Sequence, residues 1–286
     1  MIQDGEMKLF QYGPNQWVTC DDVRRALREV CADQCKVLFL HTELSFGALA
    51  PGVKRRQLCE ALFQLVMELG VETVVFPTFT FSYGNQEDFD VRNTPTRMGI
   101  LNEYVRKLPD AVRSVDPMMS VVVFGDKKGL LDVRGVKSLG EGSIFDNLHQ
   151  TEDVRFLFFG TSLGMCGTHM HYVEEILRVP YRYDMDFYGR ITDYEGRTYE
   201  DHRILYVKYR DILPCVPQSF EEMLIEKGVM QCMPLGKGHV CSITEEDMYR
   251  EVRDALTADV NAFLAEPYDT HPFVKDYRYG NVTTVQ

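Results

Sequence analysis

A buried strand, a helix and a second buried strand follow one another early in the sequence, and this order constrains the fold most strongly. Residues 36–40 and 73–76 are short apolar runs, typical of strands buried on both faces of a sheet. Between them, leucine and valine recur at helical spacing over residues 53–69, and Gly70 ends the run. Such a unit pairs its strands in parallel through a right-handed crossover. We therefore predict an α/β fold.

The same alternation continues along the 286 residues. Thr19 and Asp22 form a capping pair that predicts the start of a helix. Residues 81–98 indicate a long polar loop, and alternating residues over 187–209 predict a hairpin that turns at Glu195–Gly196. Further strands are expected at 120–125 and 155–160, and helices at 20–32, 99–107, 169–177, 218–227 and 245–264. Since the sequence contains neither repeats nor Gly/Ser-rich linkers, we expect one domain spanning 1–286.

Composition and charge exclude several classes of protein. The chain has 31 basic and 43 acidic side chains, and the net charge of −12 argues against binding to nucleic acid or to anionic lipid. The acidic N-terminus is unlike a signal peptide, and no apolar run reaches the roughly 18 residues that span a membrane. The eight cysteines contain no C-x-x-C pair, which favours free thiols. We therefore expect a cytoplasmic protein.

Residues 160–175 concentrate the side chains that could carry chemistry. Three glycines follow a predicted strand here, but their spacing does not match the G-x-G-x-x-G fingerprint of dinucleotide sites. His169, His171 and Glu175 imitate the metal ligands of a cupin-like protein. On a helix, however, the two histidines point about 200° apart, so the main prediction includes no metal. His171 and Glu174, at positions i and i+3, share one helix face, which predicts a general base with an orienting carboxylate.

Five segments, in order, are similar to the antibiotic N-acetyltransferase family, typified by the aminoglycoside 3-N-acetyltransferases. The segments are His41–Gly47 (HTELSFG), Phe76–Thr80 (FPTFT), Arg113–Ser120 (RSVDPMMS), Gly142–Leu148 (GSIFDNL) and Thr168–Glu174 (THMHYVE). The resemblance is clear over residues 36–180. It implies a three-layer αβα sandwich with a central mixed sheet, and transfer of an acyl group, acetyl or longer, from acyl-coenzyme A to an amine.

The resemblance also implies roles for individual residues. In the family's T-x-x-H-x-x-E motif the His is the general base and the Glu assists it, which corresponds to His171 and Glu174 here. Backbone amides at the start of the 168–177 helix are candidates for stabilising the oxyanion. Residues 36–180 would supply the coenzyme and catalytic parts of the site. The implied coenzyme contacts are Thr42, Glu43, Leu44, Ser45, Thr78, Arg113, Ser114 and Ser120.

Three departures from the family pattern bear on the acceptor. The chain has Asp116–Pro117 in place of His-Pro, Glu43 in the first motif, and Ser143–Ile144 in place of Ser-Pro. Residues 179–184 look like relatives associated with surface-polysaccharide biosynthesis. We therefore expect an amino-sugar acceptor, free or nucleotide-linked, with residues 181–286 shaping its side of the site. Tyr181, Asp184 and Asp186 are the candidate acceptor contacts.

Other functions stay open at this stage. The first alternative is an aminoglycoside 3-N-acetyltransferase that confers antibiotic resistance. The others are a cupin-like metal protein and a relative that binds coenzyme A without catalysis. The sequence also leaves open whether the chain forms a homo-oligomer.

Overall fold

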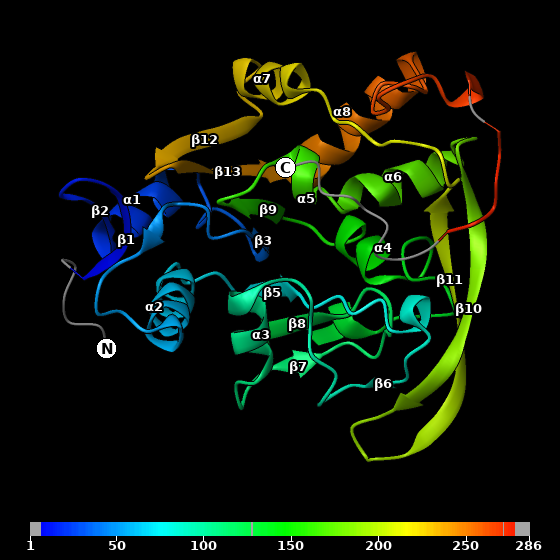
Figure 1. Ribbon diagram of the computed structural model, residues 1–286, viewed down its shortest axis with the longest axis horizontal. Coiled ribbons are helices and arrows are strands. Elements are labelled where there is room, and N and C mark those ends of the chain that lie inside the picture. Colours follow the sequence, from blue (N-terminus) through cyan, green and yellow to red (C-terminus); the bar gives the residue numbers. More distant parts are fainter. Residues whose placement is uncertain (1–6, 127, 271, 278–286) are drawn as a thin grey trace.

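The predicted strand–helix–strand unit forms the centre of the fold. The computed structural model describes residues 7–126, 128–270 and 272–277. Its seven-stranded sheet has the order β12-β13-β9-β3-β5-β8-β7 (Figure 1). β3 runs parallel to β5 and β9, whereas β8, β7, β13 and β12 add antiparallel pairs, so the predicted mixed sheet is confirmed. The strands are β3 (Val37–Thr42), β5 (Thr73–Pro77), β7 (Val112–Arg113), β8 (Val121–Gly125), β9 (Val154–Phe159), β12 (Met230–Leu235) and β13 (Gly238–Thr244).

Helices cover both faces of this sheet, which confirms the three-layer αβα arrangement (Figure 1). Successive strand residues point to opposite faces, so Leu38 and Leu40 join one core and Val37 and Phe39 join the other. The first core includes α1 (Cys20–Glu29), α2 (Arg55–Met67) and α3 (Ile100–Arg106). The second includes α4 (Ile144–His149), α6 (His169–Leu177) and α8 (Glu245–Ala258). The predicted Thr19–Asp22 capping box begins α1.

The predicted hairpin is confirmed as the long antiparallel pair β10 (Arg182–Thr192) and β11 (Thr198–Lys208). It begins five residues earlier than expected. β6 (Phe89–Asp90), within the predicted 81–98 loop, pairs in parallel with β10. Phe89 is fully buried, so the prediction of a polar loop was wrong at this point. The remaining elements are β1 (Lys8–Gly13), β2 (Gln16–Thr19), β4 (Ala48–Leu49), α5 (Leu163–Cys166), α7 (Gln218–Glu226), and the 3₁₀ turns η1 (Tyr83–Asn85), η2 (Lys128–Leu131) and η3 (Tyr268–Thr270).

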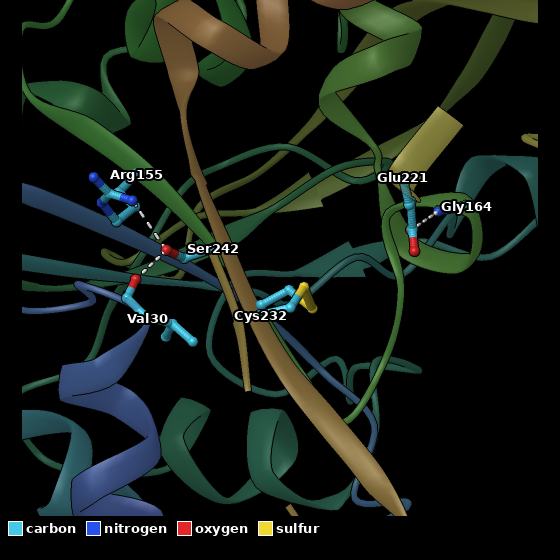
Figure 2. The surroundings of a disulfide bond; sticks show 7 residues. Val30, Arg155, Gly164, Glu221, Cys232 and Ser242 are labelled. Atoms are coloured by element: carbon cyan, nitrogen blue, oxygen red, sulfur yellow. Dashed lines mark hydrogen bonds between the residues drawn. A yellow bond between two sulfur atoms is a disulfide. The ribbon is translucent and has the colours of Figure 1, made fainter. Parts of the chain in front are cut away.

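A disulfide joins Cys232 to Cys241 across the β12–β13 hairpin, so the expectation of free thiols was wrong for this pair. The two residues lie directly opposite one another on neighbouring strands, a juxtaposition that spacing alone does not reveal. Figure 2 shows the disulfide close to Ser242, whose hydroxyl accepts from Arg155 and donates to the carbonyl of Val30. The hairpin is thus tied to β9 and to the end of α1. The other six cysteines are free.

Among the residues that the structure describes, no helix has the length and apolar character needed to cross a membrane.

Candidate active site

The site is built on α6, which follows β9 and the short helix α5. One helical turn brings His171 and Glu174 together, as predicted, with 2.6 Å between Nδ1 and Oε2. The His171 side chain is 39% exposed, whereas that of Glu174 is only 5% exposed. Within the described part of the chain, no residue makes a hydrogen bond to Nε2 of His171. The second ring nitrogen is therefore available to a ligand.

Glu174 is a buried carboxylate that neighbouring groups keep ionised. The Tyr181 hydroxyl donates to Oε1 at 2.9 Å, and Arg182 Nε forms an ion pair with Oε2 at 2.9 Å. Burial alone would raise the pKa of Glu174, but the charges of Arg182 and His171 and the hydrogen bonds outweigh it and lower the pKa to about 2. The carboxylate is consequently charged throughout the physiological pH range.

The ionised carboxylate determines the tautomer of His171. A carboxylate only accepts hydrogen bonds, so the 2.6 Å contact requires a proton on Nδ1, and in the neutral ring the lone pair is then on Nε2. Arg182 Nη2 also lies 2.9 Å from Nδ1. Because the guanidinium is a permanent donor, its favourable partner here is Glu174 and not the protonated ring nitrogen. The arrangement therefore presents an imidazole that can accept a proton at Nε2.

Tyr181 does not contact an acceptor as predicted. Its side chain is 1% exposed, and its hydroxyl serves Glu174. Arg182, the second support of the dyad, was not predicted at all. Both residues return to α6 through the turn after Val179, and no local spacing signals that contact.

Asp184 and Asp186 are exposed residues of β10 and share one face of the strand with Arg182. Asp184 forms an ion pair with Arg178, and Asp186 contacts His202 at 2.6 Å. Tyr188, two residues further on, is 69% exposed. A polar strip thus leads away from the dyad along β10, which keeps Asp184 and Asp186 as candidate acceptor contacts.

The predicted coenzyme loop, Thr42–Ser45, begins at the last residue of β3 and lies against the residue that ends β9. The amide of Glu43 donates to Phe159, and the Ser45 hydroxyl donates to the carbonyl of Gly160. Gly160 has a φ of +77°, and a Cβ there would lie 1.8 Å from the Glu43 carbonyl oxygen. Only glycine permits this approach. Glu43 and Ser45 are exposed and Leu44 is half-buried, whereas the Thr42 hydroxyl is held by Asn102 at 2.5 Å.

Arg113 does not present its guanidinium to a phosphate as predicted. It is 3% exposed and donates to Thr78, Ser120 and the carbonyl of Thr94. Burial lowers its pKa to about 9, so it stays charged at neutral pH. A surface pocket of about 400 Å³ borders the segment, but the guanidinium is directed into hydrogen bonds within the protein. Its observed contacts make Arg113 a brace between two loops.

Ser114, Ser120 and Thr78 belong to the same buried brace. The Ser114 hydroxyl accepts from the amide of Val121, and the Ser120 hydroxyl donates to the carbonyl of Thr78. All three are at most 1% exposed. These buried side chains therefore expose no surface that could contact the coenzyme, contrary to the prediction.

The alternative metal site at His169, His171 and Glu175 is excluded by the directions of the side chains. His169 contacts Glu245, His171 contacts Glu174, and Glu175 binds Lys137 at 2.8 Å. The turn of the helix separates the three side chains, as expected from the angle of about 200° between the two histidines.

The predicted oxyanion site at the start of α6 is not supported either. The amide of Met170 donates to Gly167 and that of His171 to Thr168, so neither of these two donors is free.

The family model for the aminoglycoside 3-N-acetyltransferases matches residues 39–257, and the chain belongs to this family. It is accordingly an enzyme of the acyl-coenzyme A-dependent N-acetyltransferase class. No curated protein sequence matches it significantly.

Solved structures of similar fold include YokD from Bacillus subtilis, with 18% identity and a TM-score of 0.68 over 85% of this chain and 95% of that one. Aminoglycoside acetyltransferase AAC(3)-IIb has 17% identity and a TM-score of 0.69, with 86% and 98% of the two chains covered. AAC-IIIb in a binary complex with CoASH has 15% identity and a TM-score of 0.67, with 87% and 98% covered. At these identities the likeness establishes the fold.

Proposed function

We propose that the chain transfers an acyl group from acyl-coenzyme A to the amine of an amino sugar, with His171 as the general base. The observation that carries this proposal is the His171–Glu174 contact, in which a buried anionic carboxylate leaves Nε2 free to accept a proton. Tyr181 and Arg182 hold the carboxylate in place. Membership of the family supports the acyl donor.

The chemistry requires a base because an amine attacks a thioester only in its neutral form, and most amines near pH 7 are ammonium ions. His171 Nε2 takes a proton from the nitrogen as it attacks the thioester carbonyl carbon. The tetrahedral intermediate then collapses, the carbon–sulfur bond breaks, and the coenzyme leaves as its thiolate. Glu174 stabilises the imidazolium that forms in between, which keeps the proton on Nε2 until the product departs.

The coenzyme side is proposed to be the exposed part of the loop after β3, at Glu43, Leu44 and Ser45. This loop and the Gly160 turn follow neighbouring parallel strands, so they lie at the same edge of the sheet, where ligands of α/β folds usually bind. Thr42 shapes the loop through its bond to Asn102. β13 pairs with β9 and β12 pairs with β13, which supports treating residues 1–286 as one acyltransferase domain.

On the acceptor side, two carboxylates and an exposed aromatic ring follow Arg182 on β10. Asp184 and Asp186 suit a hydroxylated or cationic sugar, and the ring of Tyr188 offers a face on which a sugar can stack. An aminoglycoside is the second candidate acceptor, because the family model that matches the chain is that of the aminoglycoside 3-N-acetyltransferases.

The test is release of coenzyme A thiol from acetyl-coenzyme A, measured against free amino sugars, nucleotide-linked amino sugars and kanamycin-type aminoglycosides. The proposal predicts the highest kcat/KM with an amino sugar. Preference for the aminoglycosides would replace it by the alternative acceptor. Asp186→Asn is predicted to raise KM for the preferred acceptor without changing KM for acetyl-coenzyme A, and equal effects on both would remove Asp186 from the acceptor site.

A further inference from the structure

Three helix ends bring His149, His169 and Glu245 together on the face of the sheet that α4, α6 and α8 cover. His149 is the last residue of α4, whereas His169 and Glu245 are the first residues of α6 and α8. His149 Nδ1 lies 2.8 Å, and His169 Nε2 2.7 Å, from the same oxygen, Oε1 of Glu245. All three ligand atoms lie within 4.8 Å of one another. The acyl-transfer chemistry uses none of these side chains.

Two imidazoles and one carboxylate form a donor set suited to zinc and similar divalent transition metals. A tetrahedral ion with bonds of about 2.0–2.1 Å separates its ligand atoms by roughly 3.3 Å. The two contacts to Glu245 are about 0.5 Å shorter than this separation, and the two imidazole nitrogens lie within 4.8 Å of one another, so side-chain shifts would bring all three ligand atoms onto one ion.

The ring of His169 has a second nitrogen that supports the same interpretation. His169 is fully buried, and its Nδ1 has no hydrogen-bond partner in the described part of the chain. A metal on Nε2 would place the ring proton on Nδ1. The buried Nε2 of His41 is likewise without a partner among the described residues, and the two histidines are close enough to influence one another electrostatically. The two nitrogens are not hydrogen-bonded to one another in the structure, and a proton on Nδ1 would make them a donor and an acceptor.

The cluster is also open to solvent on one side. His149 and Glu245 line a pocket of about 490 Å³, together with Glu246, Tyr249 and Arg250. The His149 side chain is 34% exposed, so an ion can enter from the pocket. A water molecule in the pocket would complete four-coordination.

We propose that His149, His169 and Glu245 bind one divalent transition-metal ion, with zinc as the best match, which links α4, α6 and α8. The ion replaces the two hydrogen bonds that now converge on Oε1, and each imidazole changes its tautomer without releasing a proton. The site is distinct from the His171–Glu174 dyad, because His169 and His171 point in different directions from α6.

The test is titration of the chelator-treated, untagged full chain with Co²⁺, followed by displacement with Zn²⁺. We expect one Co²⁺ per chain, with the intensified visible absorption of a four-coordinate ion, and a rise in melting temperature on addition of zinc. His149→Ala and Glu245→Gln should each weaken binding by at least about 100-fold, because even lost second-shell contacts cost 10–100-fold. His149 ends its helix and is partly exposed, so its replacement should leave the fold intact.

His202→Ala is the matched control, because His202 is an equally exposed histidine that contacts a carboxylate, Asp186, outside the proposed cluster. It should bind Co²⁺ as the unaltered chain does. Failure of the unaltered chain to bind a stoichiometric ion would overturn the proposal, and so would undiminished binding by His149→Ala. Both measurements are independent of acyl transfer.

Discussion

Replacing Glu174 with glutamine tests the electrostatic argument for the dyad. The pKa of this carboxylate falls from 4.5 to about 2, and each pKa unit corresponds to about 1.4 kcal/mol, so the ionised form stabilises the fold by about 3 kcal/mol. Since the folded-state pKa is the lower one, this contribution is present above pH 4.5 and disappears as the pH falls through about 2. Glu174→Gln should therefore lower the free energy of unfolding at pH 7 by about 3 kcal/mol.

The same substitution should slow the chemical step by about 10²–10⁴-fold. Glutamine is neutral, so it no longer stabilises the imidazolium that forms when Nε2 takes the proton. Single-turnover thiol release with saturating acetyl-coenzyme A measures this step, and urea unfolding shows that the variant is folded in the assay.

Glu175→Gln is the matched control for Glu174→Gln. Glu175 is a buried, ion-paired carboxylate on the same helix, but its partner is Lys137. The rate of the chemical step in the Glu175→Gln enzyme should stay within about threefold of the rate in the unaltered enzyme. A folded Glu174→Gln enzyme that is equally fast would show that the carboxylate does not assist His171.

Three further outcomes follow from the supporting contacts. Tyr181→Phe removes one hydrogen bond to Glu174 and should cost about 1–3 kcal/mol in urea unfolding; an unchanged midpoint would contradict the assigned bond. Arg113→Met should destabilise the fold, because it removes the hydrogen bonds to Ser120 and Thr94. KM for acetyl-coenzyme A should depend on salt concentration as it does in the unaltered enzyme. Loss of that dependence would indicate that Arg113 does contact a coenzyme phosphate. Gly160→Ala should raise KM for acetyl-coenzyme A because its Cβ meets the Glu43 carbonyl, whereas Gly196→Ala, with the same φ of +77° and open space around it, should change only stability, by about 1 kcal/mol. Equal KM values for acetyl-coenzyme A in the two glycine variants would show that the loop at Glu43 does not bind the coenzyme.

Local patterns in the sequence were sufficient for much of the sheet and for the dyad. Apolar runs located β3, β5, β8 and β9, because strands buried on both faces carry few polar residues. His171 and Glu174 meet through one helical turn, a distance that spacing alone fixes.

Contacts between distant segments could not be predicted in this way. Glu245 reaches His169 across 76 residues, and no periodicity connects the two. Arg113 lies in a short polar stretch, which is typical of an exposed side chain. The five N–H donors of its guanidinium can nevertheless be satisfied in the interior by backbone carbonyls and hydroxyls that only the fold brings together. The β12–β13 hairpin was missed because Pro234 and half-exposed residues hide its alternation.

In the proposed reaction, Nε2 of His171 accepts the proton of the attacking amine. The most direct test of this step is the single-turnover rate of acetyl transfer by His171→Ala, measured with and without added imidazole. The partly exposed position leaves room for free imidazole to enter. We predict a rate lower by about 10²–10⁴-fold that imidazole partly restores. A rate within about fivefold of the unaltered enzyme, with no response to imidazole, would contradict the role of His171 as the general base.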